Sequence, residues 1–141
     1  MSTTAKTPIT ITATIDAPVE KVWPYWTAPE HITQWNFASD EWHSPRAEND
    51  FREGGKFVTR MEAKDGSMGF DFSGTTDSIR NHEYISYILD DGRKTSISFK
   101  ENEGQTEVIE TFEPESMNPP ELQQLGWQAI LNNFKKYVEE N

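Results

Sequence analysis

Hydrophobic residues recur at intervals of three and four at the C-terminal end of the chain, over residues 121–141. This spacing places them on one face of an α-helix. The face comprises Leu122, Leu125, Trp127, Ile130, Leu131, Phe134, Tyr137 and Val138. Asn118 supplies a capping side chain, and Pro119-Pro120 supplies a proline for the first helical turn. The pattern therefore predicts one long C-terminal helix.

The N-terminal part of the chain predicts a strand and two short helices. Alternation with threonines indicates a strand at Ile9, Ile11, Ala13 and Ile15. Helical spacing follows Pro18 at Val19, Val22, Trp23 and Trp26. Pro24 is expected to kink or end this helix. Thr27-Ala28-Pro29-Glu30 fits a capping box for a second short helix, which carries Ile32 and Trp35.

Between Glu41 and Phe112 the hydrophobic period becomes two, which indicates strands. Shared faces are formed by Phe57, Thr59 and Met61, by Met68, Phe70 and Phe72, and by Ile97 and Phe99. Turn signals lie at Gly54-Gly55, Asp65-Gly66, Asn81-His82, Asp91-Gly92 and Glu103-Gly104. We therefore predict about six consecutive antiparallel strands here. A meander without alternating helices argues against a doubly wound parallel sheet and for an α+β fold.

Composition narrows the class of protein. A chain of 141 residues fits a single domain, which we place at residues 9–141 after a disordered tail at residues 1–8. The net charge of -11 disfavours nucleic acid and anionic membrane surfaces as partners. Cysteine is absent, and no apolar run approaches the roughly 20 residues that span a bilayer. We expect a cytoplasmic protein.

Several segments resemble the START-like (SRPBCC) helix-grip superfamily, and within it the homologues of the activator of the heat-shock chaperone ATPase. The resemblance rests on residues 15–23 (IDAPVEKVW), residues 26–32 (WTAPEHI) with Trp35, residues 52–57 (REGGKF) and Gly126-Trp127. It covers the chain from about Ile9 to Val138, and Pro24 departs from it. The resemblance implies a birch-pollen-allergen-like fold, in which a curved antiparallel sheet of six or seven strands wraps the C-terminal helix around an apolar cavity.

The predicted faces supply a candidate aromatic-lined cavity. Side chains that could point between sheet and helix are Trp35, Phe57, Met61, Phe70, Phe72, Tyr87, Phe99, Trp127 and Ile130. Concave apolar pockets with few polar groups are typical of small-molecule sites. The alternative is that these side chains close on one another as an ordinary core.

Glu110 is a further candidate for the same site. Strict alternation puts it on the face of Val108 and Phe112, so its carboxyl would be desolvated in an apolar cavity. Its pKa would then rise, and the group would suit proton transfer or ligand anchoring. Alternatively, Glu110 pairs with a lysine or tyrosine, or lies in water at the cavity mouth.

Other chemistry has weaker support in the sequence. Glu41 and His43 share a predicted strand face, but no nucleophile or orienting group accompanies them. The three histidines are far apart, and Gly54-Gly55 lacks the lysine-serine pair of a P-loop. We predict no catalytic residue, no metal and no cofactor.

Three functions remain open at this point. The first is a protein that holds an apolar or amphipathic small molecule in its cavity. The second is an interaction module acting on a chaperone ATPase in the stress response, although the named activators also use a separate N-terminal domain. The third is an enzyme of the cyclase or hydrolase type that uses Glu110. We favour small-molecule binding without catalysis.

Overall fold

The computed structural model describes residues 7–141. Its elements are β1 (Ile9–Ile15), α1 (Val19–Thr27), α2 (Pro29–Trp35), β2 (Trp42–Asn49), β3 (Lys56–Ala63), β4 (Gly69–Arg80), β5 (Tyr84–Leu89), β6 (Lys94–Asn102), β7 (Gln105–Phe112) and α3 (Pro120–Glu140). The predicted order of one strand, two short helices, a six-stranded meander and a long helix is confirmed, and the fold is α+β. Each predicted turn signal lies between two strands.

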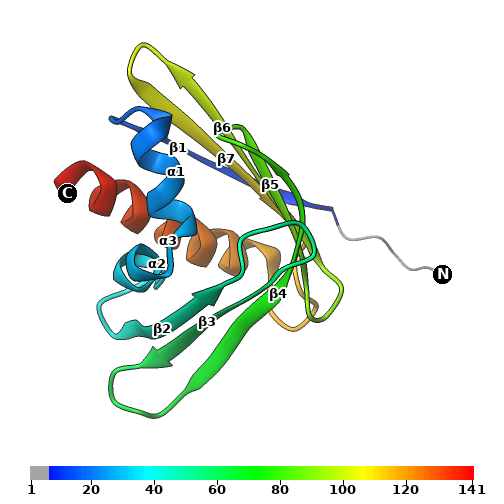
Figure 1. Ribbon diagram of the computed structural model, residues 1–141. Helices are drawn as coiled ribbons and strands as arrows, with labels where there is room; N and C mark the ends of the chain where they lie inside the picture. The colour runs from blue at the N-terminus through cyan, green and yellow to red at the C-terminus, as the bar shows by residue number, and fades with distance from the viewer. Residues whose placement is uncertain (1–6) are drawn as a thin grey trace.

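The seven strands form one antiparallel sheet in the order β1-β7-β6-β5-β4-β3-β2. The sheet curls, and α3 runs along its concave side, with α1 and α2 at the open side of the curl (Figure 1). β1 and β2 are the two edge strands, and they pack against α3 and α2 respectively. The helices therefore cover both exposed edges of the sheet, which are otherwise free to pair with other chains.

The hydrophobic core lies at one end of the sheet, around the C-terminal half of α3. Fully buried side chains there are Ile15, Val22, Ile85, Ile97, Val108, Leu131, Phe134 and Val138. The ring of Phe134 packs edge-on against Trp26 of α1 at 4.8 Å and Trp35 of α2 at 4.7 Å between centroids. This aromatic group joins the three helices to one another and fixes where α3 crosses the sheet.

The helix starts differ from those predicted. No side chain caps α3: Asn118 instead donates from its backbone N and its Nδ2 to Glu115 Oε1, at 2.8 and 3.1 Å. Nor does Thr27 cap α2, because it still belongs to α1, where its hydroxyl donates to the Trp23 carbonyl at 3.1 Å. In both cases the side chain donates a local hydrogen bond and does not accept one from a backbone amide of the helix.

The predicted apolar face of α3 is wrong at its first two members. Leu122 and Leu125 are 56% and 69% exposed. At about 100° per residue they lie on the far side of the helix from Trp127. The position that continues the buried face is Gln123, which is 8% exposed. Because this buried position holds a polar residue, the pattern of apolar residues alone did not reveal the buried face of α3.

Smaller differences concern Pro24, Met68 and the N-terminus. α1 does not end at Pro24 but continues to Thr27. Met68 lies outside β4 and is exposed, so it does not share the inner face of that strand. Of the predicted tail, all but Thr7 and Pro8 lies outside the described residues. Within residues 7–141, no helix has the length and apolar character needed to span a membrane.

Replacing Phe134 with Ala is expected to lower the free energy of unfolding by about 3 to 5 kcal/mol, because a fully buried aromatic side chain leaves a cavity between three helices. Urea denaturation measures the effect. Leu125→Ala, on the exposed side of the same helix, serves as the control and should change stability by about 0.5 kcal/mol or less. Equal effects of the two substitutions would contradict this account of the core.

Candidate functional site

A pocket of about 400 Å³ lies between the concave face of the sheet and the N-terminal half of α3. Its wall is formed by Trp26, Ile32, Trp35, Asn36, Glu48, Asn49, Phe57, Thr59, Met61, Phe70, Phe72, Tyr87, Arg93, Thr95, Glu110, Glu115, Asn118, Gln123, Trp127 and Ile130. Every strand except β1, and all three helices, contribute to it. The volume falls in the range of about 300 to 1,000 Å³ that is typical of small-molecule sites.

Cross-strand pairing builds the aromatic part of the wall. Thr59 of β3 lies opposite Phe72 of β4, and Met61 lies opposite Phe70, so the four side chains stand on one face. The Phe57 ring lies 4.7 Å from that of Tyr87 on β5. This alternation was readable in the sequence, because it repeats the period-two pattern of β3 and β4.

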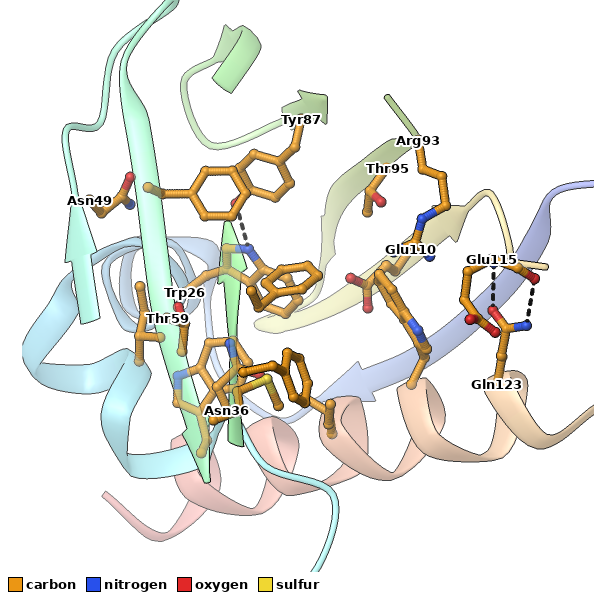
Figure 2. Close-up of a pocket in the computed structure, with 18 of the residues that line it drawn as sticks. Trp26, Asn36, Asn49, Thr59, Tyr87, Arg93, Thr95, Glu110, Glu115 and Gln123 are labelled. Atoms are coloured by element: carbon orange, nitrogen blue, oxygen red, sulfur yellow. Dashed lines mark hydrogen bonds between the residues drawn. The ribbon is translucent and has the colours of Figure 1, made fainter. Parts of the chain in front are cut away.

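The helices add three indole rings. Trp127 of α3 stacks on Phe112 of β7 at 3.9 Å and meets Phe72 edge-on at 5.9 Å. Trp26 of α1 donates from Nε1 to the Tyr87 hydroxyl at 3.2 Å (Figure 2). Trp35 of α2 donates from Nε1 to the Tyr25 carbonyl at 3.0 Å. Two of the rings are thus held by hydrogen bonds and the third by stacking, which keeps the wall in place.

One group of polar side chains lies at the end of the pocket near the start of α3 (Figure 2). Gln123 Nε2 donates to the carbonyls of Glu115 and Asn118 at 3.0 and 2.8 Å, and its Oε1 accepts from the Glu115 amide at 2.8 Å. Arg93 donates from Nε to Asp91 Oδ2 at 2.7 Å. The Gln123 hydrogen bonds connect the loop after β7 to α3, and the Arg93 hydrogen bond lies within the connection between β5 and β6.

Glu110 points into the pocket from β7 (Figure 2). It is 7% exposed and has Val108 and Phe112 beside it on the strand, and Ile97 and Ile11 opposite it on the neighbouring strands. Within residues 7–141 its carboxyl makes no hydrogen bond or ion pair. Burial raises the pKa of Glu110 to about 8, so the group is mostly protonated at neutral pH.

Neighbouring groups are also affected by burial. The pKa of the Tyr87 hydroxyl is raised by burial, and the charge of Glu110 raises it further. Two other wall residues have buried oxygens without a partner in residues 7–141, namely Thr95 Oγ1 and Asn49 Oδ1. An unpaired buried polar group lowers the free energy of unfolding, so each such group is expected to gain a partner or to have a functional role.

Nine of the ten predicted site residues line this pocket: Trp35, Phe57, Met61, Phe70, Phe72, Tyr87, Glu110, Trp127 and Ile130. Phe99 does not. It packs edge-on against Trp23 at 5.1 Å and Trp26 at 6.0 Å, inside the core. Alternation placed Phe99 on the correct face of β6, but its position along the strand puts it under α1. That these residues bind a ligand stays a prediction.

The suggested Glu41-His43 couple is not formed. Glu41 lies in the turn before β2, and His43 Nε2 lies 3.7 Å from Glu62 Oε1 on β3. Sequence reasoning also missed Arg93 and Gln123. Arg93 carries no periodic signal, because it lies in a turn. Gln123 precedes Trp127 by four residues, a spacing that would have revealed it had polar residues been counted in the stripe.

The model of one protein family, described as Activator of Hsp90 ATPase homolog 1-like protein, matches residues 16–139. The match spans nearly the whole chain. This protein belongs to that family. Its fold agrees with the START-like helix-grip superfamily that the sequence segments indicated. No match was found among curated proteins.

Solved structures from bacteria share the fold over almost their full length. The AHSA1-like protein from Aeromonas hydrophila is 44% identical with a TM-score of 0.89, and the match covers 95% of this chain and 93% of that one. A protein from Cytophaga hutchinsonii is 51% identical with a TM-score of 0.82, covering 98% and 94%. One from Chromobacterium violaceum is 24% identical with a TM-score of 0.84, covering 96% and 99%, and shows the fold alone.

The raised pKa of Glu110 predicts a pH dependence of stability. Unfolding returns the carboxyl to water, where its pKa is near 4.5, whereas in the folded protein it is about 8. Between these values the unfolded state releases a proton that the folded state keeps. Stability contributed at low pH is therefore lost as pH rises through this window, at up to about 1.4 kcal/mol per pH unit.

Urea denaturation of the wild-type protein and of Glu110→Gln across this pH range tests the effect. Glu110→Gln should become more stable than the wild type as pH rises, with the difference levelling off above about pH 8. Glu107→Gln, an exposed position on the same strand, is the matched control and should not alter the slope. A constant difference between wild type and Glu110→Gln over the whole range would refute the assignment of a buried protonated carboxyl.

Proposed function

We propose that the protein binds an apolar or amphipathic small molecule in the pocket between the sheet and α3. The observation that carries this proposal is the combination of an aromatic wall with a buried, unpaired carboxyl at Glu110. A core that served stability alone would exclude such a group, because a protonated or charged carboxyl without a partner is costly to bury. A polar ligand end would supply the missing partner.

The division of α3 supports the same proposal. Leu131, Phe134 and Val138 are fully buried in the core, whereas Trp127 and Ile130, nearer the N-terminus, are only half-buried and face the pocket. One helix thus serves two purposes: its C-terminal half packs, and its N-terminal half leaves apolar surface open. Burial of this surface by a ligand contributes about 25 cal/mol for each Å² removed from water.

Native mass spectrometry of the purified protein is the first experiment. The expected result is a species heavier than the chain by the mass of one small molecule, which is lost on denaturation. If no small molecule binds and the domain instead stimulates a chaperone ATPase, the interaction function suggested by the family description would replace ligand binding.

Trp127→Ala is expected to weaken binding of the uncharged fluorescent probe N-phenyl-1-naphthylamine by about tenfold or more, because a large aromatic contact is lost from the pocket wall. A fluorescence titration measures the affinity, and thermal unfolding checks that the variant is folded. Leu125→Ala, two residues earlier and exposed, is the control and should bind like the wild type. Equal affinity of Trp127→Ala and wild type would remove Trp127 from the site.

A further inference from the structure

The charges on the pocket wall are unevenly distributed. Its charged and titratable side chains are Glu48 of β2, Tyr87 of β5, Arg93 before β6, Glu110 of β7 and Glu115 after β7. The three helices contribute only uncharged side chains to the wall. Carboxyl groups therefore outnumber cations by three to one, in a chain whose net charge is -11. This balance disfavours an anionic ligand.

The single cation of the wall is already engaged. Arg93 forms an ion pair with Asp91 at 2.7 Å and also donates from a terminal nitrogen to the Glu113 carbonyl at 3.4 Å. Both partners lie outside the pocket wall. The Glu115 carboxylate accepts from the backbone amides of Met117 and Asn118, in the loop before α3. Glu110 is the one carboxyl group of the wall that is both buried and without a partner within residues 7–141.

Aromatic rings line the same pocket as Glu110. Phe72 and Trp127 lie in edge-on contact, and the ring centroids of Phe57 and Tyr87 lie 4.7 Å apart. The faces of such rings are negative and attract cations, more strongly where water is excluded. A carboxyl group and aromatic faces together suit a ligand that carries positive charge and hydrogen-bond donors at one end and an apolar body at the other.

We propose that the ligand is an amphipathic amine whose protonated nitrogen pairs with Glu110 while its apolar body lies along the aromatic wall. This inference rests on the proposed small-molecule function of the pocket. A protonated amine has three donors and no acceptor, so it satisfies Glu110 without presenting a lone pair to the acidic wall. A neutral alcohol offers one donor and no charge, and a carboxylate offers neither.

Proton release accompanies this mode of binding. The pKa of Glu110 is about 8 in the empty pocket, so the group carries a proton at pH 7. An adjacent cation favours the ionised carboxylate and lowers that pKa. Binding of the amine therefore transfers the carboxyl proton to the buffer, whereas binding of an uncharged ligand leaves it in place.

Three probes with one apolar body and different ends test the proposal: 4-phenylbutylamine, 4-phenylbutan-1-ol and 4-phenylbutanoate. Isothermal titration calorimetry at about pH 7 should show the amine binding about tenfold or more tightly than the alcohol, and the carboxylate binding most weakly. In two buffers of different ionisation enthalpy, the amine should release close to one proton and the alcohol none.

Glu110→Gln should bind the amine no more tightly than the alcohol and should release no proton. Glu107→Gln makes the same change of charge on the exposed face of β7 and should behave as the wild type. Amine preference that survives in Glu110→Gln would overturn the role of Glu110.

The proposal of small-molecule binding and the proposal of an amine ligand would be contradicted by different results. If the wild type binds amine and alcohol equally, or prefers the carboxylate, the amine assignment falls while small-molecule binding stands. If none of the three probes binds, and N-phenyl-1-naphthylamine does not bind either, the function proposed for the pocket falls as well.

Discussion

The packing of Phe134 between Trp26 and Trp35 is the contact on which the rest of the molecule depends. It joins α3 to α1 and α2 in the core, at the end of the helix farther from the loop after β7. Once the C-terminal half of α3 is held there, the helix spans the curved sheet as a rigid rod. Its N-terminal half then stands over a part of the concave face that curves away from it, and the space left between them is the pocket.

Glu110 shows how this arrangement accommodates a group that would be unfavourable elsewhere. Its strand, β7, is paired on both sides, with β1 and β6, and the residues opposite Glu110 on both neighbours are isoleucines. A carboxyl at such a position is normally removed by selection for stability or paired with a cation. Because burial disfavours the charged form, the pKa of Glu110 is raised and the neutral carboxyl is favoured. Local departures from good packing are typical of functional positions.

Much of the fold was predictable from the sequence, because the elements are local. The period-two segments, the glycine turns and the length of α3 depend on nearby residues alone, and the inward face of Glu110 follows from its place between Val108 and Phe112. Position along an element depends on what packs against it. For that reason the sequence predicts Phe99 in the cavity, whereas in the structure α1 covers it. The sequence likewise predicts Thr27 as the cap of α2, whereas its hydroxyl donates to the Trp23 carbonyl within α1.

The core and the aromatic pocket wall are formed largely by different strands of the sheet. The buried apolar side chains of the core cluster come from β1, β5, β6, β7 and the helices, whereas β2 and β4 add only the partly buried Ala47 and Ile79. Phe57, Met61, Phe70 and Phe72 of the pocket wall all come from β3 and β4. Substitutions in this hairpin can therefore reshape the pocket while the core stays intact. The fold itself tolerates wide variation in sequence, since solved structures with 12 to 24% identity match it with TM-scores of 0.73 to 0.84.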